Sequence, residues 1–390
     1  MAQSISQEAI GATGLPGATA ASRHAGATTS GAPTTGTFAV GDYVVDQTGA
    51  MYVCTVAGTP GTWQLSGVSI NENIAGKNFI INGGMDIWQR GTSFAGTGAS
   101  IYMADRWQLN TASTTTTSQI TSGISNIQYA MRNQRTSAST TVATNYIATS
   151  LETKNSIPMA GQTVALSFWA RAGANFSSTS NQLNAAVVYG TGTDQNVFNV
   201  LTGSTSVIAQ TATLTTSWQR FTYTGTVGST ATQVAMYFYW ATTGTAGAND
   251  YFDITGVQLE IAPQATPFSR AGGSIGGELA LCQRYYWQVG YGVIANGFAT
   301  SSTTAQFVIS LPVSMRVSPP TINPNGVYLF SASGSPYYAP SSWTLPAITP
   351  TGQNLVPVVF NYSSGGLTVG ASYYLANSSA ATYLGFSAEL

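Results

Sequence analysis

The chain has 390 residues, of which only 6% are charged, and its formal net charge is −1 at neutral pH. This balance argues against a partner such as nucleic acid or an anionic membrane surface. His24 is the single histidine and lies in the low-complexity N-terminal segment, which argues against a Ser-His-Asp or Cys-His catalytic site and against a histidine-based metal centre. Tyr, Trp, Thr, Val and Gly are abundant, which predicts an all-β protein with many turns.

Residues 1–35 are dominated by Gly, Ala, Thr and Ser. A segment of such low complexity cannot bury enough apolar surface to fold alone. We therefore expect either a disordered or extended N-terminal tail, or an extended arm that becomes ordered when it attaches the chain to a partner. The arm lacks a basic region followed by an apolar one, so we expect no secretory signal. No apolar run reaches the ~18 residues of a membrane-spanning helix, so we expect no membrane insertion.

Residues 36–77 are expected to form a small β-meander followed by a linker. The apolar runs Phe38–Val45 and Met51–Val56 flank a turn, and Gly58–Trp63 adds a second turn. A unit of this size cannot bury a sufficient core alone, so oligomerisation is the expected remedy. Cys54 in this unit and Cys282 fall in different expected domains, so we expect no disulfide between them.

Residues 78–270 are expected to form the main domain, a jelly-roll β-sandwich. We expect Asn78–Arg90 to be its first strand, with Phe79–Ile81 buried and a sharp turn at Gly83-Gly84. The density of charge in and near this stretch is high for so uncharged a chain. It predicts a fixed internal network formed by Asp86, Arg90, Asp105 and Arg106.

Four later segments of this domain alternate apolar and polar residues with a period of two, which is typical of half-buried antiparallel strands. These segments are Thr163–Arg171, Trp218–Val227, Val234–Trp240 and Tyr251–Ile261. In the last one the phase of the apolar residues slips at Thr255-Gly256, which predicts a β-bulge. Short strands separated by Gly, Thr and Asn turns favour a two-sheet sandwich or a jelly roll.

Residues 271–390 are expected to contain a short helix and then a C-terminal β-sandwich. Glu278–Trp287 begins with good helix formers and ends with aromatic residues, which predicts one or two helical turns leading into a strand. Further strands are expected at Phe307–Leu311, Val356–Tyr362, Ser372–Leu375 and Ala381–Phe386.

The acids of the main domain are the remaining source of catalytic or metal chemistry. Two carboxylates would suffice for glycoside hydrolysis, but the sequence shows no paired-acid motif. We interpret these acids as turn caps and as partners of Arg90, Arg106 and Arg220, and we assign no catalytic residue. A structural calcium ion held by Asp86 and Asp253 is the less favoured alternative to salt bridges, because the first and last strands of a jelly roll can be neighbours. No other cofactor is expected.

Aromatic side chains surrounded by polar residues are the other candidate site, since their flat faces suit sugar rings. Trp169 and Trp240 lie on expected strands, where a tryptophan is more often part of the core. Tyr337, Tyr338 and Trp343 lie among Gly, Ser and Pro, so we expect them to be more exposed. We predict that these three residues bind a glycan.

Several of these motifs carry a family likeness. Asn78–Ser93 followed by Tyr102–Trp107 resembles the carbohydrate-binding-module-like jelly roll of bacteriophage tail fibres. Ser167–Arg171, Trp218–Phe221 and Val257–Glu260 are similar to the later strands of that domain. Ala265–Phe268 and Glu278–Tyr286 resemble the joint that follows it, and Phe386–Leu390 resembles the terminus of such proteins. Val40–Asp46 and Gly58–Trp63 are similar to small β units in the stalks of phage fibres. The resemblance implies a homotrimeric virion appendage, assembled in the host cytoplasm, whose arm binds other virion proteins.

Three functions stay open at this point. The favoured one is a structural, non-enzymatic tail fibre that recognises a glycan on the host surface. A head fibre or capsid decoration protein shares every feature described above. A polysaccharide depolymerase would need a carboxylate pair that the sequence does not reveal.

Overall fold

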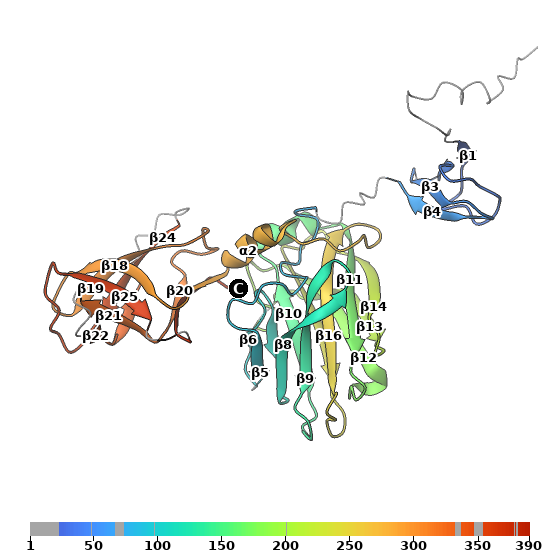
Figure 1. Cartoon of the computed structure of the whole chain (residues 1–390). Coiled ribbons are helices and arrows are strands. Elements are labelled where there is room, and N and C mark those ends of the chain that lie inside the picture. The colour runs from blue at the N-terminus through green and yellow to red at the C-terminus, as the bar shows by residue number, and fades with distance from the viewer. Residues whose placement is uncertain are drawn as a thin grey trace, which may run out of the picture. The chain divides into compact units, whose positions relative to one another are not determined.

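The computed structural model describes residues 23–47, 49–66, 74–96, 98–199, 201–331, 337–346, 354–377, 379 and 381–390. Residues 1–22 of the expected arm and residues 67–73 of the expected linker lie outside this described part. The chain divides into two compact units, Met1–Glu72 and Asn73–Leu390. The described strands form five sheets, so the all-β class is confirmed (Figure 1). No described helix is long and apolar enough to cross a membrane.

The first unit contains one small sheet of four strands in the order β1-β2-β3-β4. Its strands are β1 (His24–Gly26), β2 (Tyr43–Val45), β3 (Met51–Val56) and β4 (Thr62–Leu65). Strands β2 to β4 are the expected antiparallel meander. Strand β1 pairs parallel with β2, and Arg23 forms an ion pair of 2.7 Å with Asp42 beside it. Residues 24–26, which were expected to belong to the extended arm, therefore form an edge strand of this sheet. The pairing with β2 and the ion pair of Arg23 with the buried Asp42 carboxylate hold them there.

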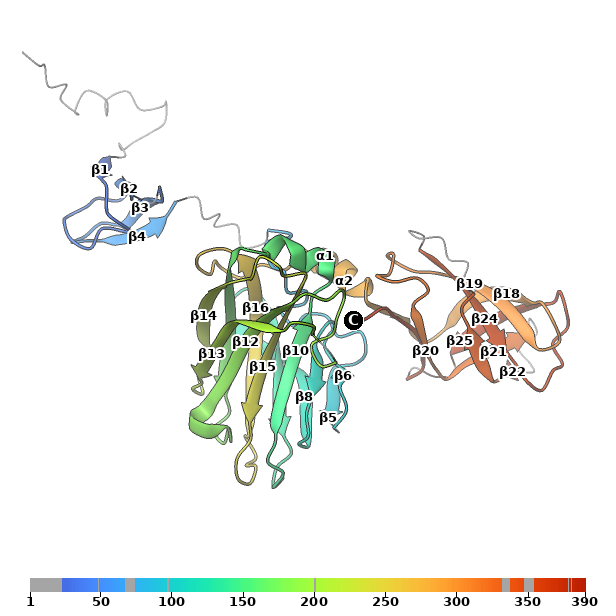
Figure 2. The same ribbon diagram turned by 180° about the vertical axis from the view of Figure 1, so that it is seen from behind.

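Two six-stranded antiparallel sheets form the central domain. The front sheet, which faces the viewer in Figure 2, has the order β13-β12-β15-β10-β7-β6. Its strands are β6 (Ile101–Tyr102), β7 (Gln108–Asn110), β10 (Thr144–Ser150), β12 (Gln182–Gly190), β13 (Thr205–Thr213) and β15 (Gln233–Ala241). The back sheet has the order β14-β11-β16-β9-β8-β5. Its strands are β5 (Ser93–Gly96), β8 (Thr115–Ile124), β9 (Ile127–Arg135), β11 (Thr163–Ala172), β14 (Gln219–Thr226) and β16 (Tyr251–Ile261).

The core of the central domain lies between these sheets. Trp107, Phe168, Phe238 and Phe252 are fully buried there, and each buried aromatic ring removes a large apolar area from water. The four strands expected from their alternation are confirmed as β11, β14, β15 and β16. Short helical turns, α1 (Thr153–Ser156), η3 (Ile157–Met159) and η4 (Thr179–Asn181), connect the longer strands.

The expected β-bulge of β16 is also confirmed. Ser167 pairs with Gln258 and Trp169 pairs with Thr255, so Gly256 and Val257 together face the single residue Phe168. Gly256 has a φ of +60°, a conformation that glycine adopts without a steric penalty.

The stretch Asn78–Arg90 is not a strand, and this expectation was wrong. It is an irregular segment, because Asn82 and Met85 have φ values of 60° and 55°, which lie outside the β region of the backbone. Hydrogen bonds from asparagine side chains to main-chain oxygens take the place of the main-chain hydrogen bonds that a strand would make with its neighbour. The Asn82 amide donates to the main-chain oxygens of Ile87 (2.8 Å) and Asp105 (3.0 Å).

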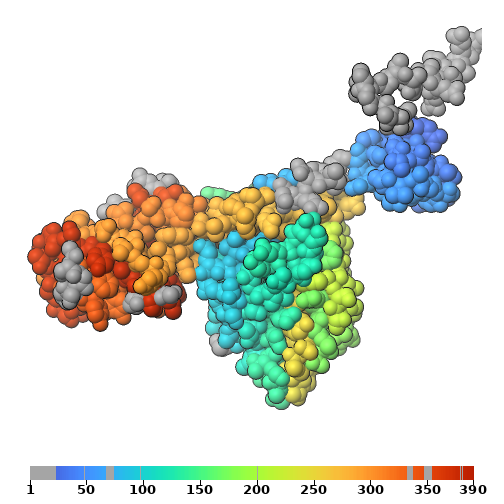
Figure 3. Space-filling model, viewed as in Figure 1, coloured from blue at the N-terminus to red at the C-terminus, as the bar shows by residue number. Residues whose placement is uncertain are grey.

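The helix expected before the C-terminal domain is confirmed as α2 (Ile275–Gln283). Ser274 caps it by accepting a hydrogen bond from the Gly277 amide. The side chain of Glu278 accepts hydrogen bonds from the amides of Gly272 and Asn82. In Figure 3 the orange residues of α2 and its flanks cover one end of the central domain.

The C-terminal domain has a three-stranded sheet, β17-β26-β20, and a seven-stranded sheet, β22-β21-β25-β18-β19-β24-β23. Its strands are β17 (Tyr286–Val289), β18 (Val293–Ala299), β19 (Thr304–Ser310), β20 (Thr321–Asn325), β21 (Val327–Ser331), β22 (Tyr337–Tyr338), β23 (Ser342–Thr344), β24 (Leu355–Asn361), β25 (Ser372–Asn377) and β26 (Tyr383–Ser387). Phe307, Phe360 and Phe386 are buried in its core. Cys54 and Cys282 are both buried and free.

Candidate functional site

Three tyrosines stand on the outward face of the front sheet. Tyr146 on β10 pairs with Tyr239 on β15, and Tyr237 follows on the same face of β15. Their ring centroids lie 5.9 to 6.1 Å apart. Ala148 and Ala186 are the direct cross-strand neighbours of Tyr237. Because these neighbours are small, space remains beside the rings.

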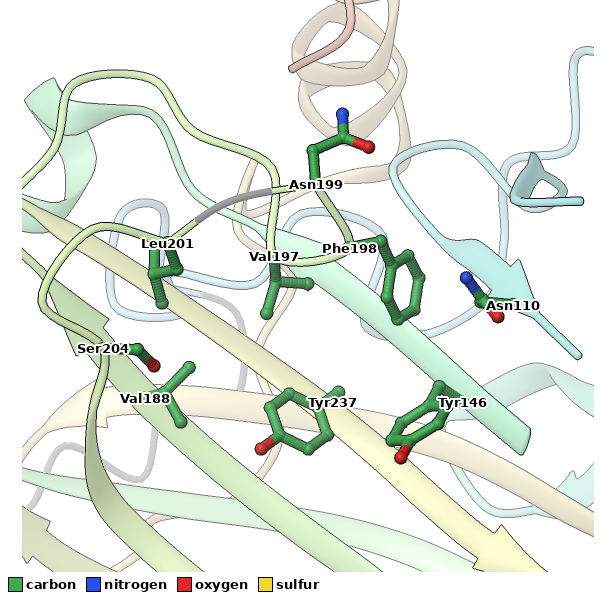
Figure 4. A pocket seen from close by; sticks show the side chains of 9 residues that line it. All are labelled: Asn110, Tyr146, Val188, Val197, Phe198, Asn199, Leu201, Ser204 and Tyr237. Carbon is green, nitrogen blue, oxygen red and sulfur yellow. The ribbon is translucent and has the colours of Figure 1, made fainter. Parts of the chain in front are cut away.

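A loop crosses one end of this face and turns it into a cleft of about 380 Å³. We call residues 191–199 and 201–204 the cleft loop. Figure 4 shows Tyr146 and Tyr237 side by side on their strands, with Val197 and Phe198 reaching over them from the loop. The phenyl ring of Phe198 meets Tyr146 edge-on, with a centroid distance of 6.3 Å. The lining residues are Asn110, Tyr146, Val188, Val197, Phe198, Asn199, Leu201, Ser204 and Tyr237.

None of the lining residues is charged. Burial raises the pKa of Tyr237, and the neighbouring phenols of Tyr239 and Tyr146 act in the same direction, so this phenol is neutral at physiological pH. The hydroxyls of Tyr146, Tyr237 and Tyr239 have no hydrogen-bond partner within the described part of the chain. Each can therefore donate to or accept from a bound ligand.

The cleft offers flat apolar faces together with uncharged hydrogen-bonding groups. Aromatic rings stack against the C–H faces of small ring-shaped ligands. The side-chain oxygen of Asn110, whose nitrogen donates to Ser100, can accept a hydrogen bond from a hydroxyl group. This chemistry suits a neutral ligand with many hydroxyls. It supplies neither a nucleophile with a base nor an acid pair.

Sequence reasoning missed this site, although a signal for it existed. The expected strand Val234–Trp240 has Val234, Met236, Phe238 and Trp240 on one face, which leaves Tyr237 and Tyr239 on the other. Two tyrosines at i and i+2 on the solvent side of a buried strand mark an aromatic surface. No strand is expected from the sequence at Thr144–Ser150, so no pattern marks Tyr146 as a surface residue.

The three predicted glycan-binding residues do not share one surface. Tyr337 is 64% exposed and packs beside Tyr328 and Phe330 on β21. Tyr338 points to the other face, where its ring contacts those of Tyr362 and Tyr373. Trp343 lies on β23, at the opposite edge of the seven-stranded sheet, and is half-buried against Phe360 of β24.

Of the two tryptophans considered on strands, Trp240 belongs to the core and Trp169 does not. Trp240 is buried and meets Phe252 edge-on at 4.6 Å. Trp169 is half-buried next to Gly256 at the bulge of β16.

The residues of the suggested calcium site, Asp86 and Asp253, have separate arginine partners. Asp86 forms an ion pair of 2.8 Å with Arg270. Asp253 is fully buried and pairs with both Arg132 and Arg171 at 2.8 Å. Within the described residues, no group of three or more His, Cys, Asp and Glu side chains could hold a metal ion.

Three of the four charges expected to form an internal network, Arg90, Asp105 and Arg106, do so together with Glu389 near the end of the chain. Asp86 is not part of this network, because it pairs with Arg270. Arg90 and Arg106 both pair with Glu389, and Arg90 lies 3.9 Å from Asp105. Arg220 differs from the expectation, since its guanidinium donates to the Ser167 hydroxyl and to the main-chain oxygen of Thr266.

Comparisons with known proteins found similarity only at the level of structure. No protein-family model matches the chain, and no curated protein matches it. Among solved structures, a CBM4 module is 18% identical, covering 46% of this chain and 98% of its own, with a TM-score of 0.28. The CBM22-1 xylan-binding domain of Paenibacillus barcinonensis Xyn10C is 15% identical, covering 48% and 96%, with a TM-score of 0.29.

A phage protein is also among the similar structures. The enzymatically active domain of tailspike protein 4 from bacteriophage CBA120 is 10% identical, covering 48% of this chain and 22% of its own, with a TM-score of 0.30. Identities and TM-scores this low carry no functional conclusion. The assignment of a jelly-roll-like sandwich rests on the two six-stranded sheets of the central domain.

Proposed function

We propose that the central domain is a non-catalytic glycan-binding module whose binding site is the cleft on the front sheet. The observation that carries this proposal is the set of three tyrosines, Tyr146, Tyr237 and Tyr239, on one outward face. A glycan supplies the C–H faces that stack on such rings and the hydroxyls that bond amides and phenols.

The ligand class follows from the charge of the cleft. Its lining contains no Asp, Glu, Lys or Arg, so a sulfated or uronic-acid-rich chain would find no cationic partner. An uncharged polysaccharide keeps its affinity when the ionic strength rises, because screening acts only between charges.

A printed array of microbial-surface and plant cell-wall glycans tests this proposal with the wild-type chain. We expect binding to at least one uncharged glycan and little dependence on salt concentration. An array without any bound glycan, or with anionic glycans alone that are released by salt, would contradict it.

We further propose that the chain is a structural subunit of a homotrimeric bacteriophage fibre, in which this module recognises the host surface. Support comes from the sequence resemblance and from the small sheet of the first unit. Val40 and Val56 are 63% and 57% exposed there, and a four-stranded unit with exposed aliphatic side chains gains stability when other copies cover it. Size-exclusion chromatography with light scattering tests the trimer, and a monomer at micromolar concentration would contradict it.

A further inference from the structure

The cleft loop is tied to the last residues of the chain through Asn196, which is only 5% exposed. The Asn196 side-chain oxygen accepts a hydrogen bond of 2.9 Å from the amide of Phe198, a residue of the cleft wall. Its side-chain nitrogen donates to the main-chain oxygen of Leu390 at 2.9 Å and to Gln108 at 2.7 Å. One side chain thus bonds both the wall of the cleft and the segment 388–390.

Arg316 makes a second connection between the same two parts. Its guanidinium donates to the main-chain oxygens of Ala388 (2.7 Å) and Glu389 (2.8 Å). The third nitrogen forms an ion pair of 3.0 Å with Asp194 at the start of the cleft loop. Asp194 also accepts a hydrogen bond of 2.8 Å from the Thr153 amide, so the loop is held from two sides.

The segment 388–390 is itself firmly held by the central domain. The Glu389 carboxylate lies between Arg90 and Arg106. Arg106 is almost fully buried and stacks over the ring of Tyr285 at 3.7 Å. Hydrogen bonds between charged groups in such surroundings are stronger than neutral ones. This anchorage gives Asn196 and Arg316 a fixed point from which to hold the loop.

We infer that Arg316 and Asp194 are positioning residues for the glycan cleft, and that through them the C-terminal domain holds the cleft loop over the tyrosines. The effect on glycan binding rests on the proposed function, whereas the holding of the loop by Arg316 and Asp194 does not. A loop ordered in advance spares the ligand the entropic cost of ordering it. Val197 and Phe198 then form the second wall of the cleft before any glycan arrives.

Hydrogen–deuterium exchange of the whole chain without glycan tests the geometry. The amides of Val197 and Phe198 bond the Ser150 hydroxyl and the Asn196 side chain, and they exchange only when the loop opens. We expect Arg316→Gln and Asp194→Asn each to speed their exchange by roughly tenfold, the factor that corresponds to about 1.4 kcal/mol. The double variant should show no further increase than the larger single one, because both changes break the same ion pair.

Arg270→Gln is the matched control. It removes an ion pair of similar length, with Asp86, which contacts no residue of the cleft loop. Exchange at Val197 and Phe198 should therefore stay at the wild-type rate even where global stability falls. Equal exchange in wild type and Arg316→Gln, or equal acceleration in the Arg270→Gln control, would overturn the inference.

Glycan affinity supplies the second readout, with the strongest wild-type ligand of the glycan array as the probe. Asp194→Asn should weaken binding while leaving Tyr146 and Tyr237 in place. Faster exchange with unchanged affinity would overturn the positioning role and leave the glycan site intact. An array without any ligand would instead refute the proposed function, while the exchange experiment still decides whether the loop is held from the C-terminal domain.

Discussion

The side-chain amide of Asn78 donates a hydrogen bond of 3.0 Å to the main-chain oxygen of Val257, at the bulge of β16. The Val257 amide in turn donates to Gly83 at 2.9 Å, and Phe79 donates to Leu259 at 2.8 Å. Strand β9 pairs with β16 only as far as Ile254. Beyond that residue, the irregular segment 78–90 supplies the hydrogen-bond partners for the main chain at this edge of β16. A bulge and a buried loop fit together here in place of two regular strands.

This fit predicts that Gly83→Ala is strongly destabilising. A Cβ atom at residue 83 would lie 2.0 Å from the main-chain oxygen of Val257, so the segment must move away from β16. We expect a loss of roughly 1–3 kcal/mol or more in the free energy of unfolding, as for other overpacked sites. Chemical denaturation followed by tryptophan fluorescence measures it.

Gly276→Ala is the matched control for this change. Gly276 lies in α2 and a Cβ atom there would meet nothing within 4 Å. Alanine should stabilise the helix by roughly 0.5–1 kcal/mol, since it restricts the unfolded chain. If both variants had the same stability, the close approach of residues 83 and 257 would be refuted.

Asp105 predicts a pH dependence of stability. Burial raises the pKa of Asp105 to about 6, although Arg90 and the Gln89 amide oppose the shift. The folded state therefore binds this proton more tightly than the unfolded state, whose aspartate pKa is about 3.9. This contribution to stability is fully present below about pH 4 and is lost as the pH rises through about 6.

Denaturation of the wild type and of Asp105→Asn at a series of pH values checks this prediction. Between about pH 4 and 6, the wild type should lose up to roughly 3 kcal/mol relative to the variant, since one pKa unit corresponds to about 1.4 kcal/mol. Parallel pH profiles for the two proteins would show that Asp105 stays ionised throughout.

The aromatic residues of the C-terminal domain predict two different outcomes. Trp343→Ala removes a half-buried ring that meets Phe360 edge-on at 5.4 Å, so we expect a loss of roughly 1–3 kcal/mol in stability. Tyr337 is 64% exposed, and Tyr337→Ala should change stability by less than about 1 kcal/mol. Thermal unfolding of both variants measures the difference, and a Tyr337→Ala protein less stable than Trp343→Ala would contradict this placement.

Alternation of apolar residues predicted the strands β11, β14, β15 and β16 and the bulge at Gly256, because side chains of a half-buried strand repeat with a period of two. The same reasoning failed for Asn78–Arg90. Ile80 is buried as expected, but Phe79 and Ile81 are only half-buried. The positive φ of Asn82 and Met85 depends on hydrogen bonds from distant parts of the chain.

The candidate site was harder to predict for a related reason. It combines β10, β15 and the cleft loop, and only strand pairing places Tyr146 beside Tyr239. The ion partner of Arg90 and Arg106, Glu389, lies 299 and 283 residues away from them in sequence. No local pattern predicts contacts of this range.

We propose that the tyrosines of the front sheet bind a glycan. Calorimetric titration of the strongest array ligand into the wild type, Tyr237→Ala, Tyr237→Phe and Tyr337→Ala distinguishes this surface from the aromatic residues of the C-terminal domain. We predict that Tyr237→Ala weakens binding by about 30-fold, or roughly 2 kcal/mol, while Tyr237→Phe keeps the ring and most of the affinity, and Tyr337→Ala binds as the wild type does. Unchanged affinity in Tyr237→Ala, together with lost affinity in Tyr337→Ala, would contradict the claim and place the binding surface on the C-terminal domain.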